Sequence, residues 1–491
     1  MSSKIEHACG LFGIWNYSDA ARIVYYGLHN LQHRGQDGAG MVVKNGDSLT
    51  RTKGTGLLSD VFTNDVFSQM KGDSAIGHVL YATGRTSGSI TVQPLLFHFE
   101  KSSLAICHNG AFVNAKSLRK RLEDYGSIFQ TKCNSEILAH IIRRSPSLTF
   151  LDGLKRALSQ IYGGFAFLTM TEDGMYAARD SRGLRPLVIG KLDGAYVIAS
   201  ETCAFAAVGA TYVRDVEPGE VVTINNEGIK SEFFTNDRGL AICGMEYIYI
   251  ARPDSDIQGI NVHTSRKNAG RILARESPIR ADVVIGSPDT GISAAIGYAE
   301  AMGIPYELGL IRNRYIGRTF ITPTQSNREI GVKMKLSAVR SIVEGKSVVL
   351  VEDSIVRGTT VQHLVKLLRA SGAKEVHMKI ASPLYKHPCY YGIDTPSPRE
   401  LVAHKRNADD ITKLIGVNSI AFISERGLAE AIGIPSDAKN RGLCMACFNG
   451  DYPTHLQDFN GIEIKNLRSI TEMPEESADF SPLEETSDDA C

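Results

Sequence analysis

Two adjacent carboxylates, Glu352 and Asp353, stand between an apolar segment and a stretch rich in hydroxyl residues, in the string VVLVEDSIVRGTT. The apolar part favours a buried strand, the middle a loop, and the following TTVQHLVKLLRA an amphipathic helix. Backbone N–H groups and the dipole at the start of that helix favour a phosphate group. Glu352 and Asp353 can bind ribose hydroxyls and magnesium, an ion that prefers oxygen ligands. The string therefore predicts a phosphosugar site.

The same string resembles the signature of the type I phosphoribosyltransferases, which bind phosphoribosyl pyrophosphate (PRPP). The spacing does not fit a Walker loop, because no Gly-Lys-Ser/Thr follows. The resemblance implies displacement of pyrophosphate from the anomeric carbon, with magnesium stabilising the departing charge. It assigns magnesium to Thr290, in GSPDTGISAA, and to the acidic pair. It assigns PRPP binding to Glu352, Asp353, Ser354, Arg357, Gly358, Thr359 and Thr360.

A second candidate for chemistry is Cys9, which opens the segment CGLFGI. If Met1 to Ala8 were removed, Cys9 would carry both a thiol and a free α-amino group. Such an amine titrates at about 7.7–8, so it can act as the thiol's own general base. LQHRGQDGAG, GHVLYATG and CHNGAFVNA follow in order. Together they resemble the class II glutamine amidotransferase domain, a four-layer αββα sandwich of the N-terminal-nucleophile type. That resemblance makes Cys9 the nucleophile, with Asn109 and the N–H of Gly110 as the oxyanion hole.

The resemblance covers the chain from Cys9 to about Tyr452, with segments such as EYIYIARPDSDIQGINVH and MKLSAVR. It is to the glutamine phosphoribosylpyrophosphate amidotransferase family, of the iron–sulfur, propeptide-bearing type. It implies that one half frees ammonia from glutamine. The other half would use this ammonia to displace pyrophosphate from PRPP, giving 5-phosphoribosylamine, the entry to purine synthesis. A homotetramer with feedback by purine nucleotides is also implied.

The cysteines offer a third candidate, because Cys444 and Cys447 form a CxxC pair while Cys243 and Cys389 stand alone. In a reducing cytosol they are not a disulfide framework. From spacing alone, a four-thiolate site could hold zinc as well as iron. The family resemblance places the ligands of a 4Fe–4S cluster at these four cysteines. Such a cluster would tie distant segments together and has no redox chemistry to perform here.

Three positions in the glutaminase half depart from the family's motifs. Leu80 stands where GHVRY has arginine, Asn134 where SSDTE has aspartate, and Ala111 where HNGNL has asparagine. The resemblance implies that the first two hold the α-carboxylate and the α-ammonium of glutamine. Arg85 and the amide of Asn134 could compensate in part.

Three functional hypotheses follow from these departures. The first is a glutamine-dependent enzyme with a rewired pocket. The second is a phosphoribosyltransferase with an impaired glutaminase half, which uses free ammonia, ammonia from a partner or another nucleophile. The third is a non-catalytic PRPP-binding regulator, against which the intact acidic pair and loop argue.

The elements that must position these residues fall into two domains, as a length of 491 residues suggests. Up to about residue 240, short strands are interrupted by helices near 21–31 and from Ser135. From about Asp282, strands and helices alternate, which is typical of a doubly wound parallel sheet buried on both faces. We therefore expect an α/β and α+β chain. Its parts are a propeptide (1–8), an amidotransferase domain (9–240), a phosphoribosyltransferase domain with the iron–sulfur ligands (241–455), and an acidic, disordered tail (456–491).

Composition excludes several classes of protein. Lys+Arg and Asp+Glu both number 54, so the net charge is zero. There is therefore no excess of basic residues to suggest a nucleic-acid or membrane partner. No apolar run is long enough for a bilayer, and the N-terminus lacks the apolar segment of a signal peptide, so we expect a cytoplasmic protein. Residues 312–335 contain six Lys/Arg and one acidic residue. They form either a basic lid over the PRPP site or a solvated surface loop.

Overall fold

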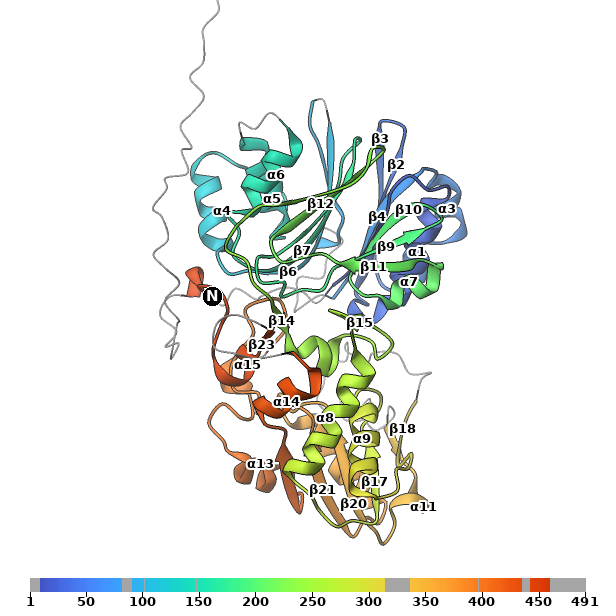
Figure 1. Ribbon diagram of the computed structural model, residues 1–491, viewed down its shortest axis with the longest axis vertical. Coiled ribbons are helices and arrows are strands. Elements are labelled where there is room, and N and C mark those ends of the chain that lie inside the picture. The colour runs from blue at the N-terminus through green and yellow to red at the C-terminus, as the bar shows by residue number, and fades with distance from the viewer. Residues whose placement is uncertain are drawn as a thin grey trace, which may run out of the picture.

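The structure is a computed structural model in which two domains stack along the long axis (Figure 1). The predicted propeptide, Arg85, nearly all of the basic segment 312–335 and most of the predicted tail lie outside the residues that the structure describes. The described residues are 9–81, 91–100, 102–145, 149–313, 336–395, 397–434 and 442–459.

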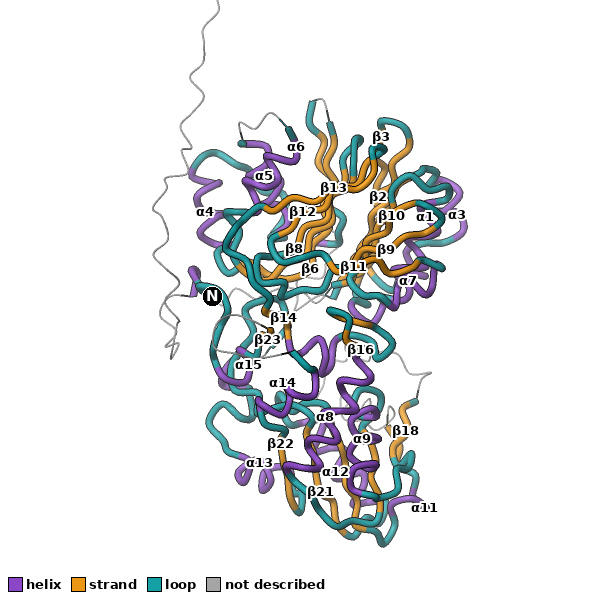
Figure 2. The backbone as a smooth tube through the Cα atoms, viewed as in Figure 1, coloured by secondary structure: helices purple, strands orange, loops and turns teal. Residues whose placement is uncertain are grey.

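The first domain contains two antiparallel sheets packed face to face (Figure 2). Apolar side chains such as Leu11, Ile76 and Leu168 fill the space between them. Within the described residues the first sheet has seven strands, in the order β11 (Thr211–Asp215), β9 (Val188–Leu192), β10 (Ala195–Ala199), β1 (Gly10–Ile14), β4 (Ser74–Leu80), β2 (Gly38–Asn45) and β3 (Ser48–Thr55). The second has six, in the order β13 (Gly228–Phe233), β12 (Glu220–Asn225), β8 (Met175–Arg179), β7 (Gly163–Met170), β6 (Ser103–Phe112) and β5 (Leu95–His98).

Helices cover both outer faces of this pair of sheets. On the first sheet lie α1 (Ala20–Asn30), α2 (Leu58–Val61), α3 (Asn64–Gln69) and α7 (Cys203–Val208). On the second lie α4 (Ala115–Asp124), α5 (Ser135–Arg144) and α6 (Phe150–Leu158). The apolar stripe of α5 explains its placement, because Ile137, Leu138 and Ile141 are buried against the sheet. These four layers confirm the predicted αββα sandwich.

The second domain is built on a parallel sheet in the order β17 (Val283–Gly286), β20 (Ser347–Glu352), β21 (Glu375–Ile380) and β22 (Ser419–Phe422). Alternate residues of β20 are buried in two different hydrophobic cores, one on each face of the sheet. Val349 and Val351 face α8 (Val262–Glu276), α9 (Ile292–Met302) and α14 (Glu425–Ile432). Val348 and Leu350 face α12 (Thr359–Ala370) and α13 (Ala408–Ile415). Burial on both faces accounts for the continuous apolar run of this strand and confirms the doubly wound sheet.

Several short elements complete the fold. The pairs are β14 (Ala241–Cys243) with β23 (Gly442–Cys444), β15 (Asp256–Ile257) with β16 (Ile260–Asn261), and β18 (Leu310–Arg312) with β19 (Leu336–Ala338). The short helices are η1 (Gln32–Arg34), the π-helix η3 (Glu246–Ile250), α11 (Arg340–Val343), η4 (Pro398–Glu400), α15 (Ala446–Asn449) and η5 (Gln457–Phe459). None of the helices in the described ranges has the length and apolar content needed to cross a membrane.

Candidate active site

Cys9 lies directly before β1, at the centre of the first sheet, and is fully buried. Its backbone N–H donates to Oδ1 of Asn109, on β6 of the second sheet, at 3.0 Å. The Nδ2 of Asn109 is buried and has no hydrogen-bond partner among the described residues. Gly110 follows at a φ of 126°, and a Cβ there would collide with the carbonyl oxygen of Gly164, so only glycine fits. The structure thus brings together Cys9, Asn109 and Gly110.

The wall beside Cys9 is apolar. Leu80 and Val92 are both buried and form one hydrophobic cluster with the Cys9 side chain. Lys53 donates from Nζ to the carbonyl oxygen of Val92 at 2.9 Å, and burial together with the charge of Arg51 lowers the pKa of Lys53 to about 8. The Leu80 side chain therefore packs beside the candidate nucleophile.

Asn134 and Ala111, the other two positions singled out in the sequence, lie in the same domain. Asn134 immediately precedes α5 and its side chain makes no capping hydrogen bond to the helix. The next residue, Ser135, donates from Oγ to the amide oxygen of Gln93 at 3.2 Å, and Gln93 adjoins Val92 of the apolar wall. Ala111 is buried on β6. Asn134 and Ser135, at the start of α5, therefore carry neutral polar groups.

In the second domain the predicted acidic pair lies at the carboxyl end of β20, with Glu352 and Asp353 both buried. Thr290 donates from Oγ1 to Asp353, 63 residues away in the chain, and Ser354 donates to the same carboxylate at 2.6 Å. Burial and the neighbouring charge of Asp353 raise the pKa of Glu352 well above its ordinary value, and burial also raises the pKa of Asp353. Two adjacent buried carboxylates of this kind favour a cation between them.

The loop after the acidic pair leads into α12 as the sequence predicts. Gly358 precedes the helix at a φ of 82°, a conformation that glycine adopts without steric cost. Thr359 and Thr360 form the exposed first turn of α12. Arg357 is exposed and its Nε contacts Glu400 at 3.3 Å. Free N–H groups at this helix start can receive a phosphate group.

The four predicted cluster cysteines line a single cavity near the domain boundary. Parallel pairing of β14 with β23 places Cys243 opposite Cys444, while Cys447 lies on α15. Cys389 accepts a hydrogen bond at 3.3 Å from the N–H of Tyr391. Burial raises the pKa of Cys243 to about 12 and those of Cys444 and Cys447 well above the ordinary value. These cysteines therefore form thiolates in the cavity only when positive charge, such as that of a bound metal, lies beside them.

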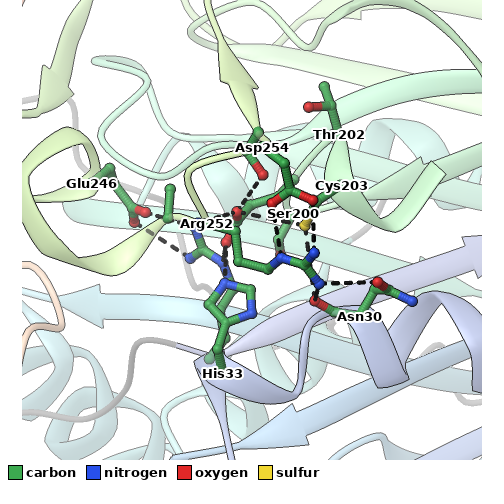
Figure 3. A network of polar contacts seen from close by, with 12 residues as sticks. Asn30, His33, Ser200, Thr202, Cys203, Glu246, Arg252 and Asp254 are labelled. Carbon is green, nitrogen blue, oxygen red and sulfur yellow. Dashed lines mark hydrogen bonds and ion pairs between the residues drawn. The ribbon is translucent and has the colours of Figure 1, made fainter. Parts of the chain in front are cut away.

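A buried ionic network joins the two domains (Figure 3). Arg34, on η1, contacts Glu201 of the first domain and Glu246 of the second, the latter at 2.6 Å. Arg185 reaches the other oxygen of Glu246 at 3.2 Å. Glu201 also accepts from Oγ of Ser255 at 2.6 Å and from the N–H of Arg252 at 2.9 Å. Although burial alone lowers the pKa of Arg34, the charges of Glu201 and Glu246 raise it.

Sequence reasoning did not identify this network. Arg34 lies within LQHRGQDGAG, which served only as a motif of resemblance. No local pattern distinguishes a buried arginine from an exposed one, and its partner Glu246 lies 212 residues away.

A cleft of about 500 Å³ lies between the domains, beside this network. Tyr81, which follows Leu80, lines it from the first domain. Arg266 and Thr290 line it from the second. The cleft is therefore bordered by the residue after Leu80 in one domain and by Thr290, the partner of Asp353, in the other.

Comparison with known proteins finds similarity over both domains. The chain matches the glutamine amidotransferase domain over residues 87–207 and the phosphoribosyl transferase domain over residues 262–397. The amidophosphoribosyltransferase of Bacillus subtilis (strain 168) is 57% identical over 453 residues, covering 92% of this chain and 95% of that protein. The amidophosphoribosyltransferase of Staphylococcus aureus (strain MRSA252) is 50% identical over 459 residues, covering 93% of each chain. The solved structure of the glutamine PRPP amidotransferase from B. subtilis, complexed with ADP and GMP, matches with a TM-score of 0.87 at 57% identity, covering 91% of this chain and 98% of that one.

Proposed function

The chain belongs to the amidophosphoribosyltransferase family, and from this premise we propose which residues carry each half of the reaction. Amidophosphoribosyltransferase converts glutamine, PRPP and water to 5-phosphoribosylamine, glutamate and pyrophosphate, the first step of purine synthesis. The observation that carries the assignment is the pairing of a buried Cys9–Asn109 site in one domain with a buried acidic pair in the other.

In the first domain, Cys9 is the nucleophile once residues 1–8 are removed. Its free α-amino group takes the thiol proton, and the sulfur attacks the amide carbon of glutamine. The bond from the Cys9 nitrogen to Oδ1 of Asn109, 3.0 Å long, uses an N–H and leaves the amine's lone pair available for that proton. Nδ2 of Asn109 and the N–H of Gly110 stabilise the oxyanion. Ammonia then leaves, and water releases glutamate from the thioester.

In the second domain, ammonia displaces pyrophosphate from the anomeric carbon of PRPP. Thr290, Glu352 and Asp353 are the residues that hold magnesium, which neutralises charge on the pyrophosphate when bound. The raised pKa values of the two carboxyls fit this assignment, because a divalent cation relieves their repulsion. The loop from Ser354 to Thr360, with Arg357 and Gly358, receives the 5′-phosphate at the start of α12.

The cavity lined by Cys243, Cys389, Cys444 and Cys447 holds a 4Fe–4S cluster. The support for this proposal is that all four cysteines, from three separate segments of the chain, line one cavity. Four thiolates there would tie these segments together through the cluster. Arg185, which lines the same cavity, adds positive charge beside the cluster.

Several broader assignments complete the proposal. The amidotransferase domain spans residues 9–240 and the phosphoribosyltransferase domain 241–455, a division supported by the start of β14 at Ala241. Purine nucleotides inhibit the enzyme, as the ADP and GMP bound to the B. subtilis relative suggest. The active form is a cytoplasmic homotetramer.

A second candidate function rests on the apolar wall beside Cys9. Leu80 is buried against Cys9 where the family has arginine, and Asn134 replaces an aspartate. Loss of both charged contacts impairs glutamine binding in the first domain. The second domain then uses free ammonia, ammonia supplied by a partner, or another nucleophile.

The test is pyrophosphate release from PRPP by the anaerobically purified protein, with glutamine or with ammonium as nitrogen donor. N-terminal sequencing of the same sample establishes whether residue 9 is the mature terminus. Activity with both donors supports the glutamine-dependent enzyme. Activity with ammonium alone supports the second candidate, and tight PRPP binding without turnover would contradict both.

A further inference from the structure

Arg266 is a buried cation that neither the PRPP loop nor the magnesium residues account for. It lies on α8 and is only 4% exposed. Its Nε donates to the carbonyl oxygen of Tyr247 at 2.6 Å, and its Nη2 donates to that of Ala251 at 2.8 Å. Within the described residues these are its only hydrogen bonds, which leaves Nη1 without a protein partner.

Arg266 lines two cavities, one within the second domain and one between the domains. Arg266, Thr290 and Asp353 line one small cavity beside the acidic pair. Arg266 and Thr290 also line the larger cleft between the domains. Thr290 belongs to the segment after β17 and bonds directly to Asp353. Arg266 therefore faces the part of the site where this segment and the acidic pair converge.

The charge of Arg266 has no close counter-ion in the protein. Two carbonyl oxygens accept its hydrogen bonds but carry no net charge, and no carboxylate in the described ranges forms an ion pair with it. Burial accordingly lowers the pKa of Arg266 to about 10, even though Asp353, Glu201 and Glu246 act in the opposite direction. Buried charges in proteins are normally paired, so an anionic ligand is the missing partner.

We propose that Arg266 binds the pyrophosphate group of PRPP and stabilises the negative charge which that group gains as it leaves. This rests on the proposed phosphoribosyl transfer at the same site. The bond from the anomeric carbon to the pyrophosphate oxygen breaks with its electron pair on that oxygen. A carbon–nitrogen bond forms to ammonia, and nitrogen then loses a proton to solvent. A guanidinium fixed in advance by two carbonyls meets the departing oxygen without reorganising.

The test compares Arg266→Met and Arg266→Lys with Arg271→Met. Arg271 lies on the same helix, but it is about half exposed and pairs with Glu300. Isothermal titration of the anaerobically purified full chain measures binding of magnesium pyrophosphate and, separately, of ribose 5-phosphate. We expect Arg266→Met to weaken pyrophosphate binding by about 10- to 100-fold and to leave ribose 5-phosphate within about twofold. Arg266→Lys should recover part of the loss, and Arg271→Met should match the wild type.

Kinetics with ammonium as donor separate a role in leaving-group departure from one in folding. Arg266→Met should lower kcat by more than it raises KM for PRPP, because the charge on the leaving group grows along the reaction. Equal losses for pyrophosphate and ribose 5-phosphate would show that Arg266 only secures the π-helix to α8 and would overturn the inference. Unchanged pyrophosphate binding by either Arg266 variant would also overturn it. Failure of the underlying function has a different signature, namely a wild-type protein that releases no pyrophosphate from PRPP.

Discussion

Nη2 of Arg34 in the first domain lies 2.6 Å from Oε2 of Glu246 in the second, and both side chains are fully inaccessible to solvent. Glu246 also contacts Arg185, and Arg34 also contacts Glu201. The four side chains therefore form a chain of alternating charge in which Glu246 is the member from the second domain. Glu246 begins the π-helix in which the carbonyl oxygen of Tyr247 accepts a hydrogen bond from Arg266. The domain boundary is thereby linked to the phosphoribosyl site.

Glu246→Gln should destabilise the protein by about 3–5 kcal/mol, because it leaves part of the charge of Arg34 and Arg185 buried without a partner. The measurement is the midpoint of thermal unfolding. Glu300→Gln is the matched control, since Glu300 is half exposed in its pairs with Lys267 and Arg271, and exposed ion pairs contribute little to stability. Equal midpoints for the two variants would contradict a structural role for the buried network.

The same network predicts a loss of stability in acid. Despite a burial effect in the opposite direction, the charges of Arg34 and His33 hold the pKa of Glu201 well below its ordinary value of 4.5. The unfolded chain therefore binds a proton at Glu201 before the folded chain does. The stabilisation is fully present above the unfolded pKa and decreases as pH falls from about 4.5 towards the lowered pKa. Unfolding midpoints from pH 7 to pH 3 should fall more steeply for the wild type than for Glu201→Gln, and parallel curves would refute this assignment.

Cys9→Ala should abolish pyrophosphate release with glutamine and leave release with ammonium within about twofold, because only the first domain uses the thiol. Cys107→Ala is the matched control. Cys107 is fully buried near Cys9, and burial raises its pKa well above the ordinary value, which opposes formation of its thiolate. Loss of the ammonium reaction in folded Cys9→Ala protein would show that the two sites are not separate.

Leu80→Arg tests the apolar wall beside Cys9. A guanidinium at this position can bind the α-carboxylate of glutamine through a charge-assisted hydrogen bond worth about 1.5–3 kcal/mol. We expect kcat/KM for glutamine to rise by about one to two decades, and further when Asn134→Asp is added. Leu80→Met keeps the size without the charge and should leave kcat/KM near the wild-type value. A folded Leu80→Arg protein with unchanged glutamine use would show that the pocket recognises the α-carboxylate in another way.

Cys444→Ala should remove iron from the purified protein, because it takes one of four thiolate ligands from the cavity. Iron and sulfide analysis together with visible absorbance measures the loss. Cys203→Ala serves as the control, since Cys203 is buried in the first domain and contacts Glu201 and Asn30 rather than the cluster cavity. Zinc in place of iron in the wild-type protein would refute the cluster assignment.

Features set by neighbouring residues were predictable from the sequence. The apolar run of β20, the acidic pair and the amphipathic stripe of α12 all lie within one short segment, and the predicted helix from Thr359 to Ala370 has the observed bounds. The prediction that Thr290 and Asp353 belong to one magnesium site came from the family resemblance. No local pattern could give it, because only folding brings these two residues together.

Features that depend on burial and distant partners were not predictable. Arg34, Arg185 and Arg266 look like ordinary surface cations in the sequence, yet all three are buried. The partners of Arg34 and Arg185 depend on how the two domains dock, and those of Arg266 depend on how α8 packs against the π-helix. Resemblance singled out Leu80 as a departure from the family motif, but only the structure places it in one cluster with Cys9 and Val92.

The central claim is that the two sites act in one reaction, and the most direct measurement is the ratio of glutamate to pyrophosphate formed. Wild-type protein is supplied with PRPP, magnesium and glutamine as the only nitrogen donor, and both products are measured in the same sample. The account predicts one glutamate for each pyrophosphate, since each transfer consumes one ammonia from glutamine. Pyrophosphate release without glutamate, or release only after ammonium is added, would contradict it.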